Sequence, residues 1–280
     1  MSTETLSVLM SVYAGEIPQH FDVAMESIWD AQTRQPDEIV LVVDGPINEE
    51  LSSHVLRWKQ HIGESMKVLW LEQHQGTGLA KQQGFYRCNG DYIAIMDTDD
   101  QSIPERFQLQ LDCFKNNPEL MVVGGQVTEF ISNDDGSYTM LQRKQTPLLG
   151  HEIMAFSKQR NPFTHVTLMV RREAMERIGG YRHHWFMEDY NLCLRFLAKL
   201  GPDKVLNMPN VLVNVRIDNG MFQRRTGWTY IKSEWQLAWL KIELSWQSLP
   251  MVWLYFFARS IPRLLPSSLL RKVYRLLRYR

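Results

Sequence analysis

The sequence predicts an α/β protein: a mostly parallel sheet flanked by helices, a smaller antiparallel sheet, and a helical C-terminal tail. Three observations predict this fold. Short apolar runs alternate with helical patterns in the first hundred residues. Longer strand-like runs, two of them separated by the turn signal NDDG, follow in the second hundred. The remaining residues are helical in pattern, then apolar and basic.

The first half predicts a repeated strand–helix–strand unit. Strands are expected at residues 5–13, 37–45, 67–72 and 91–97, with helices at 18–31, 49–61 and 78–87. Right-handed crossovers in such a parallel sheet bring the carboxyl ends of the strands to one edge, where open α/β sheets bind ligands. Asp44 and Asp97 each follow a strand at this edge.

The second half predicts strands at 121–132, 137–144 and 164–170 and helices at 172–178, 188–200 and 229–244. The predicted organisation is one domain over residues 1–220, with halves 1–100 and 101–220, followed by a helical segment over 221–280.

Charge is distributed unevenly along the chain. The formal net charge is zero, but the last thirty residues contain seven basic and no acidic residues, so the first 250 carry −7. The three cysteines fit neither a disulfide framework nor a zinc site, which predicts a reducing cytosol. The N-terminus lacks the features of a signal peptide, and no apolar run has the length of a spanning helix.

The stretch DTDD places Asp97, Asp99 and Asp100 directly after a buried strand. Clustered carboxylates repel unless a cation or a raised pKa relieves them. A divalent Mg²⁺ or Mn²⁺ ion that shares ligands with a substrate phosphate would relieve them. The alternative is a helix cap before Pro104, which explains Asp100 or Ser102 but not all three acids.

Two neighbouring features have both a functional and an ordinary reading. The glycines of GTG precede a helix that carries Lys81, so backbone N–H groups there can face an anion, or form an ordinary turn. The pattern is neither a Rossmann fingerprint nor a Walker loop. Asp44, before Gly-Pro, is either a turn former or part of the same site as Asp97.

The segment GGYRHHWFMEDY predicts a second set of site residues. Glu188 and Asp189 are either helix-start carboxylates or, near apolar walls, a general base. The preceding glycine-rich, aromatic stretch, with Trp185, is typical of a mobile stacking loop. His165 either faces the same cleft or is structural, and Arg225, with Arg224, either binds phosphate or lies in a solvated turn.

The tail predicts a basic amphipathic helix. On a helical wheel, the apolar residues of 269–277 cover about 160° of arc, opposite Arg271, Lys272, Arg275 and Arg278. Such a helix lies on an anionic bilayer; the alternative is packing against the domain or a partner. Nucleic acid is not expected as a partner, because the first 250 residues are acidic and the tail is rich in apolar residues.

Taken together, the motifs SVLMSVY, LVVDG, GTGLAKQQG, DYIAIMDTDD and GGYRHHWFMEDYNLCLR resemble those of family 2 glycosyltransferases of the GT-A fold. The resemblance covers about residues 5–200 and is strongest to bacterial enzymes that build O-antigen and exopolysaccharide, the amylovoran type among them. It implies that the parallel half binds a nucleotide sugar and that the antiparallel part lies on the acceptor side.

The resemblance also implies roles for the donor-side residues. Asp44 would contact the uracil of a UDP-sugar, and Lys81 would pass near the nucleotide. Asp97 would lie near ribose and metal, Asp99 would ligate Mn²⁺ or Mg²⁺, and Asp100 would hold the donor sugar. The chain departs from many relatives in having VVDGP rather than VVDDGS, which bears on how the base is recognised.

For the acceptor side the resemblance implies that Asp189 is the catalytic base and that Glu188 is its neighbour in the acceptor site. Trp185 and His165 are expected in the same site, and Arg225 with the nucleotide. Because QRRTGW does not match the Q-x-x-R-W of processive synthases, single sugar addition is implied.

The implied reaction is an inverting transfer of glucose or galactose from a UDP-hexose to GlcNAc on undecaprenyl diphosphate, giving a β-glycoside. The implied location is peripheral, on the cytoplasmic face of the bacterial inner membrane. Two alternatives stay open: a sugar nucleotidyltransferase, although SVYAGEIPQH lacks the glycine-rich basic loop of that class, and an inactive binding protein of the same fold.

Overall fold

The computed structural model describes residues 4–133, 137–217 and 227–264. Over these residues nine strands form one sheet with the order β3-β2-β1-β4-β8-β6-β9-β5, and β7 pairs with β6. The strands are β1 Leu6–Val12, β2 Glu38–Val43, β3 Met66–Trp70, β4 Tyr92–Ile95, β5 Gln101–Ser102, β6 Val122–Ser132, β7 Tyr138–Lys144, β8 Met169–Arg171 and β9 Val205–Arg216.

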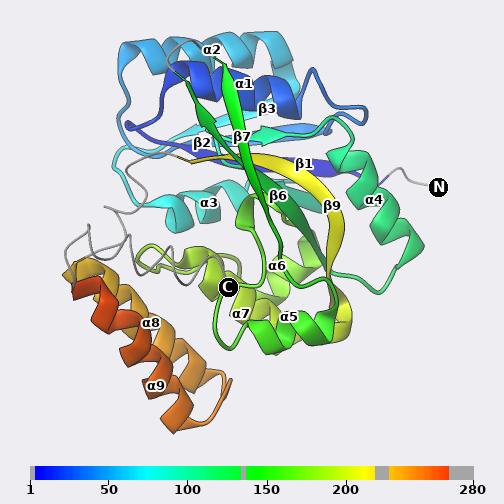
Figure 1. Cartoon of the computed structure of the whole chain (residues 1–280). Coiled ribbons are helices and arrows are strands. Elements are labelled where there is room, and N and C mark those ends of the chain that lie inside the picture. The colour runs from blue at the N-terminus through cyan, green and yellow to red at the C-terminus, as the bar shows by residue number, and fades with distance from the viewer. Residues whose placement is uncertain (1–3, 134–136, 218–226, 265–280) are drawn as a thin grey trace.

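The helices cover both faces of this sheet (Figure 1). They are α1 Pro18–Ile28, α2 Glu49–Ile62, α3 Thr77–Phe85, α4 Arg106–Asn116, α5 Gly150–Phe156, α6 Arg172–Ile178, α7 Glu188–Leu200, α8 Trp228–Glu243 and α9 Leu249–Ser260. Short 3₁₀ turns lie at Gly63–Ser65, His165–Thr167, Pro202–Lys204 and Ile261–Leu264. The α8–α9 hairpin lies apart from the sheet at the lower left of the view.

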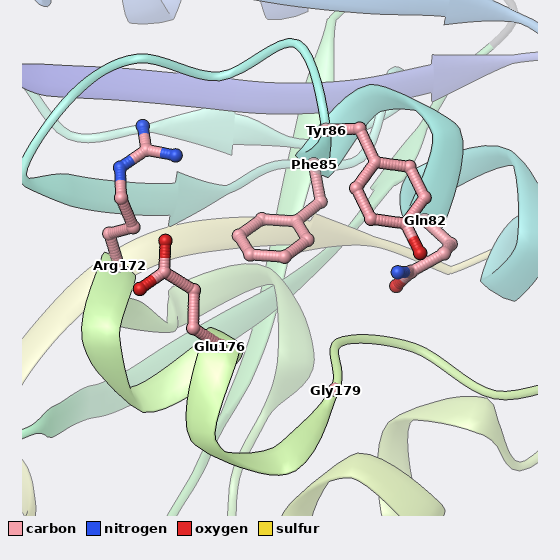
Figure 2. A pocket seen from close by; sticks show the side chains of 6 residues that line it. All are labelled: Gln82, Phe85, Tyr86, Arg172, Glu176 and Gly179. Atoms are coloured by element: carbon pink, nitrogen blue, oxygen red, sulfur yellow. The ribbon is translucent and has the colours of Figure 1, made fainter.

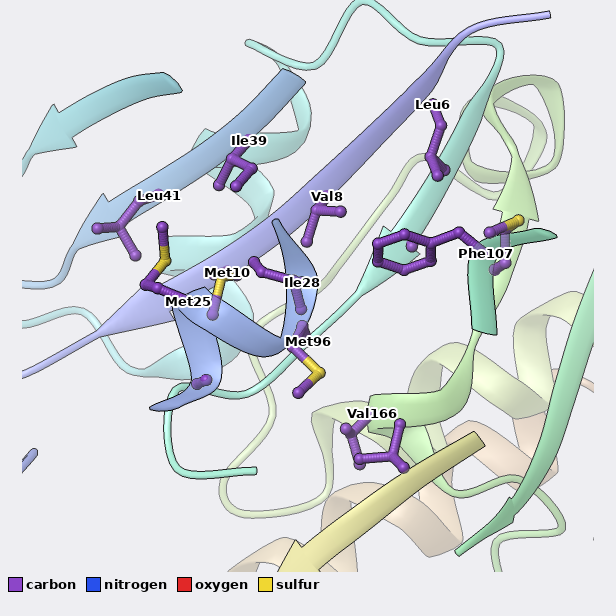
Figure 3. Packing of buried hydrophobic residues seen from close by; sticks show 14 of the residues in the cluster. Leu6, Val8, Met10, Met25, Ile28, Ile39, Leu41, Met96, Phe107 and Val166 are labelled. Atoms are coloured by element: carbon purple, nitrogen blue, oxygen red, sulfur yellow. The ribbon is translucent and has the colours of Figure 1, made fainter. Parts of the chain in front are cut away.

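The parallel half of the sheet confirms the prediction from the sequence. β1 pairs in parallel with β2 and β4, and β2 pairs in parallel with β3. Strand β1 alternates its side chains, so that Val8 and Met10 face α1 and α2 while Leu9 faces α3. Figure 3 shows side chains of β1, β2 and α1 pointing toward one another in the first of these two cores.

The predicted antiparallel strands are present, but they continue the parallel strands in the same sheet rather than forming a separate one. β8 pairs antiparallel with both β4 and β6 and so joins the two halves. The strand expected at 164–170 is wrong in its first part, because His165–Thr167 form a 3₁₀ turn and β8 begins at Met169. The turn ends on the hydroxyl of Thr167, which donates to the carbonyl of Thr164.

Strand β9 was not predicted, and its sequence explains why. NMPNVLVN contains Pro209, which cannot donate to a strand ladder. The parallel pairing of β9 with β6 shifts register between Asn207 and Val211, so the proline falls within an irregularity. Long-range pairing with the buried strand β6 therefore outweighs the local sequence signal.

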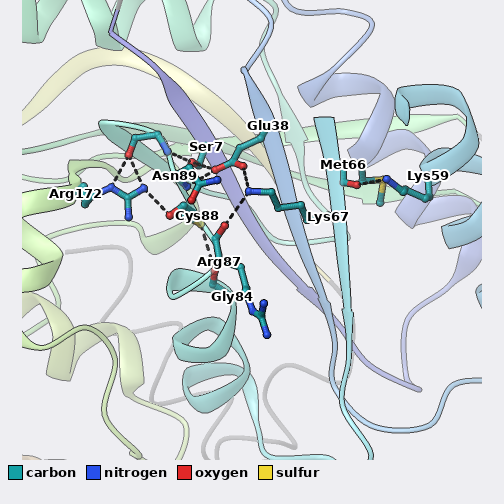
Figure 4. Close-up of polar contacts among 11 residues, drawn as sticks. Ser7, Glu38, Lys59, Met66, Lys67, Gly84, Arg87, Cys88, Asn89 and Arg172 are labelled. Atoms are coloured by element: carbon teal, nitrogen blue, oxygen red, sulfur yellow. Dashed lines mark hydrogen bonds and ion pairs between the residues drawn. The ribbon is translucent and has the colours of Figure 1, made fainter. Parts of the chain in front are cut away.

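The sheet is fastened at the amino ends of its strands by a buried polar network around Glu38 (Figure 4). The Glu38 carboxylate accepts from the Ser7 hydroxyl at 2.6 Å, from the Lys67 ammonium at 2.5 Å, and from the Asn89 amide. Arg172 donates to the carbonyls of residues 88 and 90 in the same connection. The network fixes the α3–β4 connection against the ends of three parallel strands.

Protonation of Glu38 is expected to weaken this network. Burial opposes ionisation of Glu38, but the hydrogen bonds from Lys67, Ser7 and the Asn89 amide outweigh it and hold the pKa of Glu38 below its usual value. A carboxyl group with a lowered folded-state pKa contributes stability above its unfolded pKa of about 4.3 and loses it as the pH falls further.

The C-terminal segment is helical where the structure describes it, as expected. Within the described ranges no helix has the length and apolar character needed to cross a membrane. The amphipathic helix predicted around residues 269–278 lies outside the described residues, as do Arg224 and Arg225.

Replacing Glu38 tests the importance of this network. Glu38→Ala leaves a buried hydroxyl and an amide without their acceptor, and we expect it to lower the free energy of unfolding by about 2–3 kcal/mol. Lys67 reaches solvent and contributes the smaller part. Urea unfolding from pH 3 to 8 checks this: the difference from wild type should be constant above about pH 5 and narrow below about pH 4.

The control for this experiment is Glu173→Ala, which removes an exposed ion pair with Arg177 one turn along α6. It should change the free energy of unfolding by less than about 0.5 kcal/mol. Equal effects of the two substitutions, or a difference that does not depend on pH, would contradict the role given to Glu38.

Candidate active site

The chain reverses its order of strands at the carboxyl ends of β1 and β4. From β1 the chain moves to β2 on one side, and from β3 it returns through α3 to place β4 on the other side of β1. Such a switch point leaves a crevice in which α/β proteins bind ligands. Asp97 follows β4 there, and Glu16 lies in the connection that follows β1.

A buried lysine faces the first acid of the DTDD stretch. Lys81, on α3, is fully buried, and its Nζ lies 2.5 Å from Oδ1 of Asp97. Burial opposes the ionisation of Asp97, but the Lys81 ammonium outweighs it and holds the pKa of Asp97 below its usual value. The sequence did not predict this ion pair, and the burial of Lys81 excludes the reading of Lys81 as a solvated charge.

The other two acids carry the opposite perturbation. Burial, with the charges of Asp97 and Glu16, raises the pKa of Asp99 to about 7. Burial and the charges of Asp99 and Asp97 raise the pKa of Asp100 well above its usual value. Proximity to other acids and loss of water thus destabilise the charged forms of both groups.

Arg216, at the end of β9, is a cation that contacts the loop carrying these two acids. Its backbone N–H donates to Oδ1 of Asp100 at 2.8 Å, and its Nε donates to the carbonyl of Asp99 at 3.1 Å. The guanidinium lies 4.7 Å from the ring centroid of Phe130 and also contacts Tyr138. These contacts orient the loop that carries both acids.

The acidic cluster suits a divalent cation only in part. Its donors are oxygens, the type that Mg²⁺ and Mn²⁺ prefer, and its destabilised carboxylates would gain from a positive charge. Among the described residues, however, no three His, Cys, Asp or Glu side chains converge closely enough to hold an ion by themselves. Asp97 and Asp99 would therefore hold a cation together with oxygens from a ligand or water.

Asp44 lies at the same edge, but its carboxylate already has partners. It accepts from the backbone N–H groups of Gln75 at 2.7 Å and Gly76 at 3.0 Å, and His74 Nδ1 lies 2.9 Å from its second oxygen. The ring of His74 in turn lies 6.0 Å from that of Tyr13. Asp44 thus fixes the loop that leads into α3 and borders the crevice.

Asp189 lies in the first turn of α7, whose start packs against α3. Its carboxylate accepts from the Asn161 side chain at 2.9 Å and from the Tyr190 amide at 2.6 Å. Burial and the charge of Asp189 raise the pKa of the neighbouring Glu188 to about 7. A Cβ added to Gly78 would lie 3.0 Å from Cβ of Glu188, so α3 and α7 meet closely at this point.

His165 faces this group of residues and is neutral. Burial and the charge of Lys81 lower the pKa of His165 to about 4, against the opposing effects of Asp97 and Asp189. Its Nε2 lies 2.8 Å from the hydroxyl of Tyr181. Besides burial, the charges of Lys81, Asp97 and Asp189 act on the pKa of His165, so its ring lies near these three residues.

The stretch 181–187, expected as a mobile loop, is held by contacts at both ends. The Tyr181 amide donates to Gln82 at 2.5 Å, and Arg195 donates to the carbonyls of residues 178 and 180. The Trp185 amide donates to Gln236 of α8, and the ring of Phe186 stacks on Tyr230. The Trp185 side chain is exposed beside that of His183.

A separate hollow of about 380 Å³ lies between α3 and α6. Figure 2 shows Phe85 pointing from α3 toward Arg172 and Glu176 of α6. None of its lining residues belongs to the acidic cluster or to the Asp189 group. The crevice at the strand ends therefore remains the candidate site, on the strength of its chemistry.

Sequence reasoning missed four residues that the structure brings to this site: Glu16, Arg216, Asn161 and Tyr181. Glu16 accepts from the Thr98 hydroxyl, within the DTDD stretch itself. Glu16, Arg216 and Asn161 lie in no run of acids and no recognisable motif, so only contacts across the fold identify them. Tyr181 lies in the GGYRHHWFMEDY segment, which did not single it out. Arg216 was missed for a second reason: it is the last residue of β9, a strand that the sequence did not predict.

A switch point bordered by clustered carboxylates, a buried lysine and a facing carboxylate places the protein among nucleotide-binding α/β proteins. The model of the glycosyl transferase family 2 matches residues 7–179, which is more than half of the chain. The chain belongs to glycosyltransferase family 2.

Relatives extend this likeness over nearly the whole chain. It is 38% identical over 268 residues to the amylovoran biosynthesis glycosyltransferase AmsE of Erwinia amylovora, covering 96% of this chain and 97% of the relative. It is 29% identical over 276 residues to the UDP-Gal:alpha-D-GlcNAc-diphosphoundecaprenol beta-1,3-galactosyltransferase of Escherichia coli, covering 98% and 96%.

Solved structures show the same GT-A fold. S. aureus TarS 1–349 in complex with UDP-GlcNAc superposes with a TM-score of 0.64 at 13% identity, covering 91% of this chain and 73% of that chain. The mannosyltransferase PcManGT of Pyrobaculum calidifontis, in complex with GDP-Man and Mn²⁺, gives a TM-score of 0.61 at 14% identity, covering 99% and 81%.

Substitutions of two adjacent glycines test whether Gln82 holds the start of the 181–187 loop. Gly179 and Gly180 both have positive φ, of 73° and 67°. A Cβ on Gly179 meets nothing within 4 Å, whereas one on Gly180 would lie 2.1 Å from the Gln82 oxygen that binds the Tyr181 amide. Gly179→Ala should cost about 1 kcal/mol of stability from backbone strain alone.

Gly180→Ala should cost about 2–3 kcal/mol, since it adds loss of a buried hydrogen bond to the same strain. Urea unfolding measures the stabilities, and hydrogen exchange should show the Tyr181 amide exchanging faster only in Gly180→Ala. Equal costs and unchanged exchange in both variants would contradict the anchoring role of Gln82.

Proposed function

We propose that the protein is an inverting hexosyltransferase that moves glucose or galactose from a UDP-sugar to GlcNAc linked to undecaprenyl diphosphate. The product would be a β-glycoside in O-antigen or exopolysaccharide synthesis. The observation that carries the proposal is a carboxylate, Asp189, that is held by two donors and lies near His165, as Asp97 of the acidic cluster also does.

The relatives support the substrate classes. The E. coli relative is named for UDP-Gal as donor, for GlcNAc-diphosphoundecaprenol as acceptor and for a β-1,3 linkage. The Erwinia relative is named for amylovoran biosynthesis. Since both align over nearly the whole of this chain, the acceptor-side residues belong to the shared region as well.

In the proposed reaction Asp189 acts as general base. The Asn161 and Tyr190 donors fix its carboxylate, which is proposed to take the proton of an acceptor hydroxyl. The oxygen of that hydroxyl forms a bond to the anomeric carbon as the bond from that carbon to the UDP oxygen breaks. Attack from the opposite face inverts an α-linked donor into a β-linked product.

Asp189 and Glu188 are proposed to have different roles toward the acceptor: Asp189 takes the proton, and Glu188 binds an acceptor hydroxyl. Because the pKa of Glu188 is raised to about 7, it exists near neutral pH in both protonated and ionised forms and can donate or accept a hydrogen bond from an acceptor hydroxyl. Neutral His165 and exposed Trp185 offer an uncharged hydrogen-bonding group and a stacking surface for the same sugar.

On the donor side, Asp97 and Asp99 would hold a divalent cation, Mn²⁺ or Mg²⁺. Such a cation, when bound, neutralises the charge that develops on the leaving diphosphate. Lys81 keeps Asp97 ionised for this purpose. Asp100 is proposed to hold the donor sugar, Asp44 to border the uracil, and Arg225, which lies outside the described residues, to contact the diphosphate.

The basic C-terminal sequence is proposed to hold the enzyme on the cytoplasmic face of the inner membrane. Residues 265–280 contain five basic residues and no acid. Near an anionic lipid surface each basic residue contributes about 1 kcal/mol of attraction. A membrane-bound acceptor would then be met by diffusion along the surface.

Replacing the proposed base separates binding from chemistry. Asp189→Asn keeps the shape of the side chain but cannot accept the proton, so transfer should fall by about 10²–10⁴-fold while UDP affinity stays within about twofold. The assay uses a panel of UDP-hexoses with a synthetic GlcNAc-diphosphate lipid, and NMR gives the linkage of the product.

The matched control is Asp203→Asn, an exposed aspartate in the 3₁₀ turn after α7, which should transfer sugar like wild type. Full transfer by Asp189→Asn would exclude Asp189 as the base. Retaining stereochemistry in the product would exclude the proposed displacement.

Deleting residues 266–280 tests the role of the tail. The deletion removes the five basic residues of this region, so we expect the membrane-bound fraction of the protein in cell lysates to fall and its soluble fraction to rise. Immunoblotting of both fractions measures the shift, with transfer to a water-soluble acceptor as a check on folding. Unchanged partitioning would refute the proposed role of the tail.

A further inference from the structure

The α8–α9 hairpin carries exposed aromatic and aliphatic side chains on both of its helices. On α8, Trp228, Trp235 and Trp239 recur at helical spacing and are all exposed. On α9, Leu254 and Phe257 are 57% and 55% exposed. We call the exposed side chains Trp228, Trp235, Trp239, Met251, Leu254, Phe257 and Ile261 the aromatic face.

The hairpin is also held by contacts on the side opposite this surface. The opposite side of α8 packs Tyr230, Leu237 and Leu240 against residues of α7. The two helices are tied to each other by the buried Glu234 on α8, which lies 2.8 Å from Arg259 on α9. Of the aromatic face, Trp235 adds to this packing through its ring contacts with Trp253 and Phe256 of α9.

The rings of the aromatic face are ordered by contacts with one another and with the partly buried rings of Trp253 and Phe256. Trp235 contacts Trp239, Trp253 and Phe256 with ring centroids 5.4–6.0 Å apart. Phe257 contacts both Trp253 and Phe256. An apolar surface built on two paired helices and left open to water is typical of a binding surface rather than of chance exposure.

The composition of the surface indicates a lipid partner. Tryptophan is enriched at the boundary between headgroups and acyl chains, because its ring is apolar and its N–H is polar. Helix α9 has Arg259 as its one charged residue, and that residue is paired with Glu234. At 12 residues it is about 18 Å long, too short to span a bilayer but long enough to lie along its surface.

Charge agrees with this partner. The exposed acid of α8, Glu243, is at the far end of the helix and is paired with Arg182. The sequence that continues directly from α9 adds Arg271, Lys272, Arg275, Arg278 and Arg280 and no acid. The aromatic face is therefore continuous in sequence with a basic segment, the combination that binds anionic lipid surfaces.

We propose that the aromatic face is a membrane-docking surface whose rings enter the interface of a phospholipid bilayer. It acts separately from the basic tail: the aromatic face supplies apolar insertion into any phospholipid surface, and the tail supplies attraction to anionic lipid. α8 also holds Trp185 and Phe186 of the loop before Glu188, so docking would bring the acceptor side of the site near the bilayer.

The test measures binding of the full chain to vesicles in the absence of sugar nucleotide, so its outcome does not depend on the proposed transfer. Vesicles are either pure phosphatidylcholine or phosphatidylcholine with phosphatidylglycerol. The triple variant Trp239→Gln, Leu254→Gln, Phe257→Gln should bind about tenfold or more weakly to both kinds of vesicle. Flotation gives the bound fraction.

Two control variants isolate the effect. Leu56→Gln with Trp70→Gln removes exposed apolar side chains from α2 and β3 and should bind like wild type. Neutralising Arg271, Lys272, Arg275 and Arg278 to Gln should remove only the added affinity for the anionic vesicles. Transfer by the triple variant to a water-soluble acceptor should equal that of wild type, which shows that it is folded.

Two results would overturn the proposal. One is vesicle binding of the triple variant equal to that of wild type. The other is a concentration-dependent dimer of the wild-type chain that the triple substitution dissociates, seen by sedimentation velocity without lipid, since the occupant of the surface would then be a second copy.

Discussion

The ion pair between Lys81 and Asp97 is the contact around which the candidate site is organised. A fully buried ammonium is tolerated only beside an opposite charge, and Asp97 supplies it at 2.5 Å. Lys81 is on α3, whose start is fixed by Asp44 through the amides of Gln75 and Gly76. The pair thus connects the carboxyl ends of β2 and β4 through one helix.

The same helix relates the donor and acceptor sides. Gly78 on α3 packs closely against Glu188 at the start of α7, so any larger side chain there would separate the two helices. Charges on both sides affect one another here, since the pKa of Glu188, which burial and Asp189 raise, is also affected by the charges of Lys81 and Asp97. The site is therefore one electrostatic unit, although its residues come from positions 16 to 216 of the chain.

The ionised forms of the two other acids, Asp99 and Asp100, are destabilised by their surroundings. The pKa of Asp99 and that of Asp100 are raised because water is excluded and neighbouring acids repel, and Arg216 offsets only part of this through its contacts with their loop. Functional sites commonly contain charged groups that are destabilised in this way. Binding of a cation and an anionic ligand would relieve the repulsion between the acids. By contrast, the Glu38 network at the opposite ends of the strands satisfies its buried charge fully and fixes the sheet.

The sequence by itself determined the parallel half of the sheet, because each of its strands is a short apolar run between turn signals, and crossover rules then set the edge that carries Asp44 and Asp97. It also identified Asp99, Asp100, Glu188 and Asp189 through local clusters of acids. Only the tertiary structure decided that β9 joins the sheet despite Pro209, that the antiparallel strands extend the same sheet, and that Glu16, Asn161 and Arg216 reach the site. Local patterns encode period and turns, whereas these features depend on contacts between residues far apart in the chain, whose partners no single segment specifies.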